Sequence, residues 1–172
     1  MTGCMDSTLV PGLSNTAAMS GEVGMIVNVK FDLPAEAVLI PVIRCQVDAL
    51  LQHMGVTEDD VYRAGIVVTE ACSNVVRHAY AEPGQRYRVE LEYHAERLVV
   101  TVTDFGRGFD ACDVPEPSLG QIGGYGIYFM RESADKLEFS RPGGTGTRIE
   151  AEICLHYRSD EALDFARELD RS

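Results

Sequence analysis

Two hydrophobic periodicities follow one another in this sequence, and their order limits the folds that the chain can adopt. Between residues 57 and 79, apolar residues recur at helical spacing, at Val61, Ala64, Gly65, Val68, Ala71, Cys72, Val75 and Ala79. Between residues 87 and 93, apolar and charged residues alternate in the pattern of a half-buried strand. Helices early in the chain, followed mainly by hairpin-connected strands, predict an α+β fold with helices covering one face of a sheet.

Other patterns place further helices in this fold. We expect a first helix that runs from Ala35 to about Met54 and stops at Gly55, with Pro41 either kinking it or marking its real beginning. Thr57 and Asp60 have the spacing of a capping box for the second helix. A third helix should begin near Gly124, after Pro83-Gly84 and a loop at residues 106–122.

Along the sequence, one predicted strand precedes the first two helices and the other strands follow them. The first covers residues 25–31, and residues 98–103 form a hairpin with residues 87–93. Two further strands, at residues 136–140 and 147–155, pair around a glycine-rich turn. Within one domain at residues 25–157, these elements leave a tail at residues 1–24 that we expect to be disordered. Residues 158–172 form a C-terminal extension that can hold a short amphipathic helix.

The formal net charge of −12 narrows the range of partners. Clustered Lys and Arg drive binding to nucleic acid and anionic lipid, so we expect this acidic chain to bind neither. The five cysteines are scattered without a metal-ligand spacing, as is typical of reduced thiols. No apolar run approaches the roughly 20 residues that cross a bilayer, and the N-terminus lacks a signal-peptide pattern. We therefore expect a cytoplasmic protein.

Polar residues recur on one side of the second predicted helix. Glu70, Asn74 and His78 are spaced by one helical turn and face away from the apolar stripe. An ordinary solvated face would look the same from this helix alone. The Asn74 carbonyl oxygen nevertheless suits Mg²⁺, which takes few protein ligands, and Glu70 can accept a proton from an attacking hydroxyl. We expect a structural role for His78.

A second cluster follows the strand at residues 98–103. Asp104 ends this strand, where a sheltered carboxylate can accept a hydrogen bond from the exocyclic amine of adenine. Gly106 and Gly108 let the following backbone pass close to a ring, although an Asp-x-Gly turn is also common between strands. Thr147, before the last strand, can support the same adenine contact through its hydroxyl.

A third cluster consists of Gly123, Gly124 and Gly126, directly before an apolar helix pattern. Backbone N–H groups at a helix N-terminus point toward an anion, and glycine allows a phosphate to come close. The chain has neither a Walker A pattern nor a Rossmann fingerprint after its first strand. Together, a metal ligand, a base reader and a phosphate cradle in this order indicate an ATP site of a different type.

These residues resemble the GHKL ATP-binding superfamily, and residues 25–155 resemble its small bacterial anti-sigma factor serine kinases. The resemblance rests on Glu70-x-x-x-Asn74-x-x-x-His78-Ala-Tyr, Asp104-x-Gly-x-Gly108, Gly124-x-Gly126 and Gly146-Thr147. It implies a two-layer α/β sandwich with a mixed, mostly antiparallel sheet and helices on one face. ATP and Mg²⁺ would be the cofactors.

The resemblance also implies roles for residues and partners. Asn74 would be the metal ligand, Asp104 the adenine reader, residues 109–126 the lid, and Glu70 the base that helps a serine attack the terminal phosphate. Such proteins sequester a sigma factor and phosphorylate an anti-anti-sigma partner of the STAS type, commonly as homodimers.

One departure bears on turnover. Residues 111–122 contain no Arg or Lys, although charge on a transferring phosphoryl group normally needs a cation beyond Mg²⁺. Either Arg107 or Arg131 substitutes, or catalysis is slow. The alternative is therefore a nucleotide-binding module that sequesters its partner without phosphorylating it.

Two further readings are less favoured by the sequence. The ATP-binding module of a sensor histidine kinase would need an upstream helical hairpin with a phospho-acceptor histidine, and only one helix, ending at His53, fits between Pro34 and Gly55. An α+β domain without any nucleotide site would require all three motifs to be coincidental.

Overall fold

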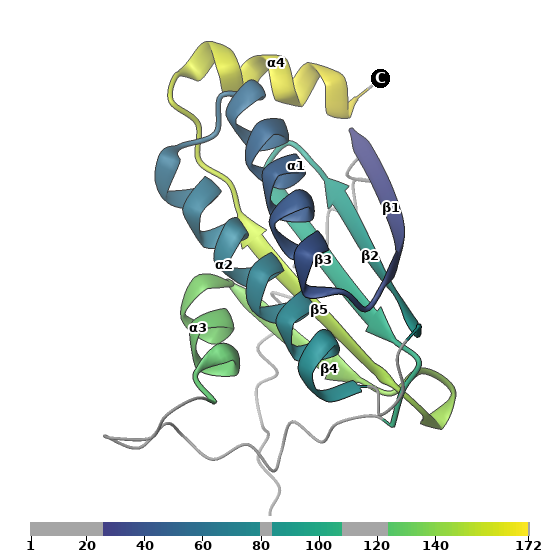
Figure 1. Ribbon diagram of the computed structural model, residues 1–172. Coiled ribbons are helices and arrows are strands. Elements are labelled where there is room, and N and C mark those ends of the chain that lie inside the picture. The colour runs from purple at the N-terminus through teal and green to yellow at the C-terminus, as the bar shows by residue number, and fades with distance from the viewer. Residues whose placement is uncertain (1–25, 80–83, 108–123, 172) are drawn as a thin grey trace, which may run out of the picture.

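The computed structural model describes residues 26–79, 84–107 and 124–171, and it has two layers (Figure 1). One layer is a five-stranded sheet in the order β1-β2-β3-β5-β4. Its strands are β1 Val27–Pro34, β2 Arg86–Tyr93, β3 Arg97–Asp104, β4 Lys136–Ser140 and β5 Thr147–Cys154. The helices are α1 Ile40–His53, α2 Glu58–Asn74, α3 Gly126–Ser133 and α4 Asp160–Asp170. All four strand pairings are antiparallel, and α1 and α2 cover one face, so the predicted α+β class is confirmed, while the described sheet is antiparallel and not mixed.

The β2–β3 hairpin forms where the alternating pattern predicted it. The apolar residues of β2, from Tyr87 to Tyr93, are fully buried against the helices, while the charged residues between them are at least partly exposed. β1 extends further than predicted, because it continues to pair with β2 through Pro34 opposite Arg86. β1 is an edge strand, so a proline without an N–H group does not interrupt the sheet.

The first helix begins later than Ala35. A short 3-10 turn at Ala37–Leu39 precedes α1, which starts at Ile40 and has Pro41 in its first turn. Pro41 therefore marks the beginning of the helix and does not kink it, because its fixed φ suits a first turn that needs no N–H donor. The helix ends directly before Met54 and Gly55, as predicted.

The second helix begins after Thr57 but is not capped as predicted. The Thr57 hydroxyl donates to Asp60 Oδ2 at 3.1 Å, so it does not cap the helix N-terminus. After Asn74 the helix widens into a π-helical turn at Val75–Ala79, a feature that frequently marks functional sites. The helical spacing expected up to residue 79 is therefore present as an α-helix to Asn74 and as a π-helical turn after it.

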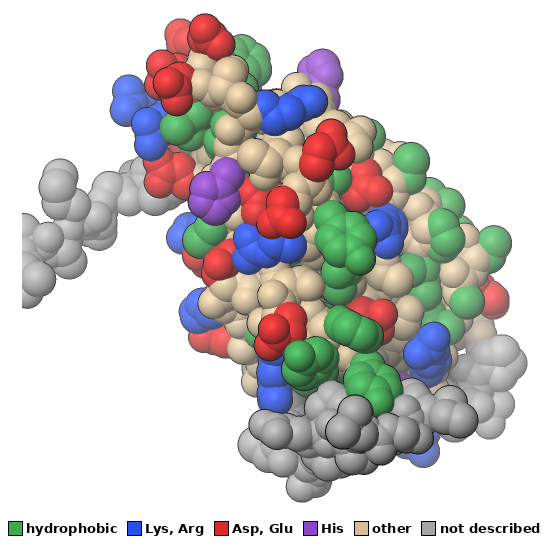
Figure 2. Space-filling model, turned by 90° about the vertical axis from the view of Figure 1, so that its left-hand side faces the viewer, with side chains coloured by type: hydrophobic (Ala, Val, Ile, Leu, Met, Phe, Trp, Pro, Cys, Tyr) green, Lys and Arg blue, Asp and Glu red, His purple; other side chains and the backbone are tan. Residues whose placement is uncertain are grey.

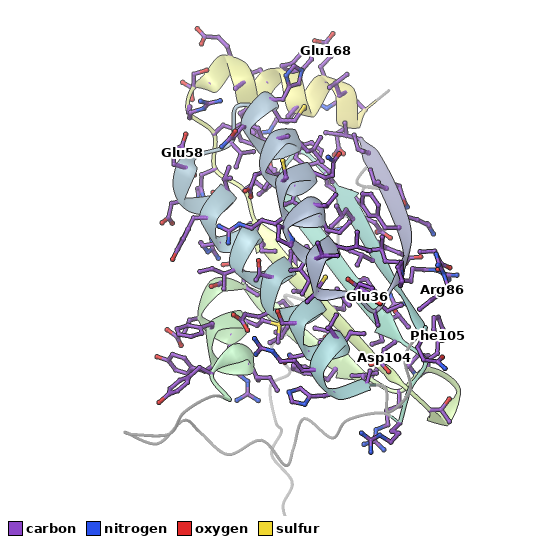
Figure 3. All side chains as sticks on the ribbon, viewed as in Figure 1. Glu36, Glu58, Arg86, Asp104, Phe105 and Glu168 are labelled. Atoms are coloured by element: carbon purple, nitrogen blue, oxygen red, sulfur yellow. The ribbon has the colours of Figure 1, made fainter. Side chains whose placement is uncertain are left out.

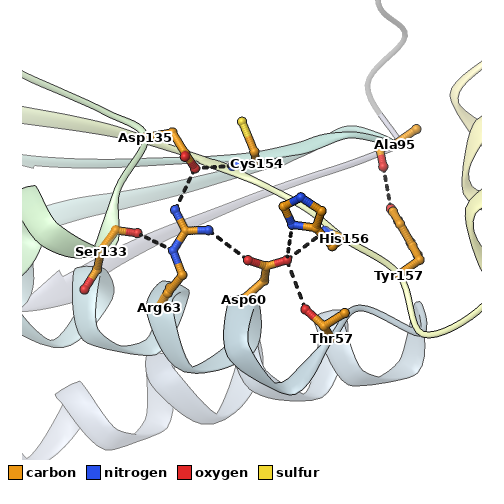
Figure 4. A network of polar contacts seen from close by, with 9 residues as sticks. All are labelled: Thr57, Asp60, Arg63, Ala95, Ser133, Asp135, Cys154, His156 and Tyr157. Carbon is orange, nitrogen blue, oxygen red and sulfur yellow. Dashed lines mark hydrogen bonds and ion pairs between the residues drawn. The ribbon is translucent and has the colours of Figure 1, made fainter.

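A polar network fastens the first turns of α2 to two distant segments (Figure 4). The Asp60 carboxylate is 2% exposed and accepts hydrogen bonds from the backbone N–H of His156 at 2.7 Å and from Arg63 Nη1 at 2.8 Å. Arg63 also donates to the Ser133 carbonyl at 3.0 Å and to Asp135 Oδ2 at 2.8 Å. Burial acts to raise the pKa of Asp60, but the hydrogen bonds from His156, Arg63 and Thr57 outweigh it and hold that pKa below its ordinary value.

The remaining helices lie at the margins of the α/β layers. α4 packs at the upper end in Figure 1, where Ala162 closely approaches Gly55 and Ala166 is fully buried. α3 lies beside α2, and hydrophobic side chains gather on the surface of this side of the molecule (Figure 2). Tyr62, Tyr128 and Phe129 are among the exposed large hydrophobic residues. Among the described helices, none is long and apolar enough to cross a membrane.

Candidate nucleotide-binding site

An open pocket of about 180 Å³ lies where four elements meet. The last turn of α2 with the π-helical turn forms one wall, and the end of β3, the start of β5 and the start of α3 form the others. The described residues that line it are Glu70, Asn74, Val75, Arg77, His78, Ala79, Asp104, Gly124, Gly126, Ile127, Thr147 and Ile149. Residues more than 70 positions apart in the sequence therefore share one cavity.

Glu70 and Asn74 lie against the N-terminal end of α3. A Cβ atom placed on Gly126 would come within 2.7 Å of Glu70 Oε2 and 3.5 Å of Asn74 Oδ1. A side chain at position 126 would therefore have to displace the Glu70 carboxylate, which is the end of a flexible side chain. Two side-chain oxygens from one face of α2 thus lie close to the N-terminus of α3, where backbone N–H groups have no helical partner.

Asp104 lies at the opposite wall, at the end of β3 (Figure 3). Asp104 is 4% exposed. It pairs across the sheet with Thr147 of β5, which is 5% exposed. Asp104 Oδ1 accepts a hydrogen bond from the Gly106 N–H at 2.8 Å, which fixes the carboxylate orientation. Within the described part of the chain, no group donates to Oδ2, so this oxygen can accept from a ligand.

Gly146, which belongs to the motifs of the resemblance but had no predicted role, shapes the same wall. Its φ is +71°, and a Cβ atom there would clash with the backbone carbonyl of Asp104. The Gly146 N–H donates to the Gly106 carbonyl at 3.0 Å, so the two glycines join the β3 end to the β5 start. The glycine-rich turn before Thr147 was the signal that could have identified this residue.

Most of the predicted site residues lie together. Glu70, Asn74, Asp104, Gly124, Gly126 and Thr147 all line the pocket. Gly106 does not line the pocket, but its N–H donates a hydrogen bond to the Asp104 carboxylate. Gly108 and Gly123 lie outside the described residues, as does most of the expected lid at residues 109–126.

Two polar residues of the pocket had no predicted binding role. Arg77 and His78 belong to the π-helical turn, are exposed and line the pocket. The structure gives no support for the structural role expected of His78, because its side chain faces solvent at the pocket and is not packed in the core. Arg77 follows Glu70 by seven residues, a helical spacing that could have revealed it.

The donor set is compatible with a magnesium ion bound mainly through phosphate. In the described part of the chain, no three His, Cys, Asp or Glu side chains form a cluster that could hold a metal by themselves. Mg²⁺ usually takes one or two protein oxygens together with water and substrate phosphates. The neighbouring oxygens of Asn74 and Glu70 match that requirement.

Comparison with known proteins agrees with this geometry. The family described as "Histidine kinase-like ATPase domain" matches residues 33–153, so the chain belongs to the histidine kinase-like ATPases. The serine-protein kinase RsbW of Halalkalibacterium halodurans is 33% identical over 129 residues, which cover 67% of this chain and 77% of that protein. The serine-protein kinase RsbW of Bacillus subtilis is 28% identical over 127 residues, with coverage of 67% and 79%.

A solved structure shows the same fold. The RsbU and RsbW domains of Rv1364c from Mycobacterium tuberculosis superpose with a TM-score of 0.57 and 17% sequence identity, over 75% of this chain and 32% of that chain. The resemblance to the GHKL superfamily and its serine kinases, inferred from the motifs, is confirmed. Membership of an ATPase family makes ATP the nucleotide of this domain, while the roles of individual pocket residues stay predictions.

Proposed function

We propose that this protein is an ATP-dependent protein serine kinase that is also an anti-sigma factor. It sequesters a sigma factor and phosphorylates a serine of an anti-anti-sigma partner of the STAS type. The observation that carries the proposal is the pocket that Asp104 and Thr147 line together with Glu70, Asn74 and the start of α3. Its relatives carry the name serine-protein kinase, which favours kinase turnover over sequestration alone.

The two ends of the pocket suit the two ends of ATP. At the buried end, Asp104 Oδ2 accepts a hydrogen bond from the adenine amine, while Oδ1 stays bound to the Gly106 N–H. Thr147, beside Asp104 in the sheet, supports this contact. At the other end, Gly124 and Gly126 expose the backbone N–H groups at the N-terminus of α3, where a phosphate can bind closely.

Asn74 would be the protein ligand of a magnesium ion in this proposal. The ion would supply positive charge that neutralises the phosphate oxygens. Asn74 Oδ1 offers a neutral hard oxygen and lies close to Gly126, where the phosphates are expected.

Glu70 is the proposed general base. Its carboxylate takes the proton of the attacking serine hydroxyl, whose oxygen forms a bond to the terminal phosphorus as the bond from that phosphorus to the ADP oxygen breaks. The half-buried position of Glu70 beside Gly126 brings its carboxylate close to the place proposed for the terminal phosphate. The protein acts in the cytoplasm as a homodimer, and it binds neither nucleic acid nor membrane.

Titration calorimetry with ATP and ADP, with and without Mg²⁺, tests nucleotide binding. We expect metal-dependent ATP binding by the wild type. In Asp104→Asn, replacing one acceptor oxygen with a donor amide should weaken binding about tenfold to a hundredfold. Asn74→Ala should remove the metal dependence, and Asp59→Asn, on the exposed start of α2, serves as the charge-matched control. A wild type that binds no ATP would refute the proposal.

Transfer of labelled phosphate from ATP to an anti-anti-sigma protein tests the kinase step. The expected product is a phosphoserine that disappears when the acceptor serine is changed to alanine. Binding of ATP and of the partner without any transfer would leave sequestration as the function.

A further inference from the structure

The proposed reaction concentrates negative charge on the phosphoryl group, and the structure narrows the search for a protein cation to balance it. Residues 111–122 have no Arg or Lys. Arg107 and Arg131, the substitutes indicated by the sequence, are not among the described residues that line the pocket. Phosphoryl-transfer sites commonly place an arginine or lysine beside the transferring group in addition to the metal.

Arg77 is the one described lining residue with a permanent positive charge. It follows Asn74 by three residues and Glu70 by seven, so the three side chains occupy neighbouring positions along one side of the helix. The π-helical turn begins at Val75, directly after Asn74, and contains Arg77. The long guanidinium side chain starts within one helical turn of the proposed magnesium ligand.

The surroundings of Arg77 differ from those of the arginines that pair with carboxylates in this acidic protein. Six described arginines pair with carboxylates within 4 Å: Arg44, Arg63, Arg86, Arg97, Arg148 and Arg167. The Arg77 side chain has no such ion pair with a described residue, and unlike other described arginines without one, such as Arg88 and Arg131, it lines the pocket. In a chain with a net charge of −12, an arginine at the wall of a pocket that no described carboxylate pairs with is available for an anionic ligand.

We propose that Arg77 binds the terminal phosphate of ATP and neutralises its charge during transfer to serine. The inference rests on the proposed kinase function. A guanidinium group can donate two parallel hydrogen bonds to one phosphate, which fixes its position as well as its charge. Arg77 thereby takes the part that a cation from the lid would otherwise play, and the absence of Arg and Lys from residues 111–122 no longer argues against turnover.

The test compares ATP with ADP, because only ATP carries the terminal phosphate. Calorimetry with Mg²⁺ should show that Arg77→Gln weakens ATP binding about tenfold while the affinity for ADP stays within about twofold. The rate of phosphate transfer at saturating ATP should fall at least about a hundredfold. Arg77→Lys should recover part of the ATP affinity, since it keeps the charge but not the paired donors.

Arg88→Gln is the matched control, because it removes the same charge from an exposed position on β2 outside the described pocket lining. Its affinities and rate should equal those of the wild type. Equal losses of ATP and ADP affinity in Arg77→Gln, no loss, or the same loss in Arg88→Gln would each overturn the role of Arg77 while leaving the kinase assignment in place. Failure of the wild type to bind ATP would instead remove the kinase function and this inference together.

Discussion

The two ends of α2 use polar residues in opposite ways. At its start, Asp60 and Arg63 are held by Ser133 of α3 and by Asp135 and His156, which follow α3 and β5. At its other end, the side chains of Glu70, Asn74 and Arg77 make no hydrogen bond or ion pair to the described residues and instead line the pocket. Paired polar groups hold elements together, whereas half-exposed polar groups without partners keep their hydrogen-bonding capacity for a ligand. On this single helix, the residues that stabilise the fold are therefore separate from the residues that can bind a ligand.

The largest effect should come from the pocket end of α2. Glu70→Gln removes the proton acceptor but keeps the shape of the side chain, so phosphate transfer should fall about 10²- to 10⁴-fold. ATP affinity and the thermal midpoint should stay close to wild type, because no described residue depends on the Glu70 carboxylate for a hydrogen bond. Single-turnover transfer and calorimetry measure these quantities. An unchanged rate would show that Glu70 is not the base.

The opposite result is expected at the start of α2. Asp60→Asn leaves Arg63 without one of its two carboxylate partners in a largely buried setting, and should lower the free energy of unfolding by about 3 kcal/mol. The ATP affinity of the folded protein should not change. Urea unfolding with Asp59→Asn as the exposed control measures the difference, and that control should lie within about 0.5 kcal/mol of wild type. Equal stability of the two variants would mean that the network does not fasten α2.

The smallest effect is a pH dependence of the same network. The folded protein holds the pKa of Asp60 below its ordinary value of about 3.9. Asp60 therefore contributes stability that is fully present above about pH 4 and is lost as the pH falls through the folded pKa. The difference in unfolding free energy between wild type and Asp60→Asn should become smaller as the pH falls below 4. A difference that stays constant down to pH 3 would contradict the pKa direction.

The same contrast explains which features could be predicted from the sequence. The buried residues of β2 and α2 follow local periods of two and 3.6 residues, so their positions were readable without any knowledge of the fold. The extent of β1 was not, because Pro34 is tolerated only through its place at the edge of the sheet. Asp60 had the spacing of a cap residue, but its decisive partner, His156, is 96 positions away.

By itself, the sequence determined the fold class, the order of the elements and six of the residues that meet in the pocket, because helical and strand spacing and glycine-rich turns are local properties of the chain. Only the tertiary structure decided the rest. In the folded structure, Arg77 lies in the π-helical turn and lines the pocket. Gly146 is required because a Cβ atom there would clash with the Asp104 carbonyl. Asp60 holds α2 to the segment after β5 through its hydrogen bond from His156. The contacts of Gly146 with Asp104 and of Asp60 with His156 join segments that are distant in the sequence, and no local pattern encodes them.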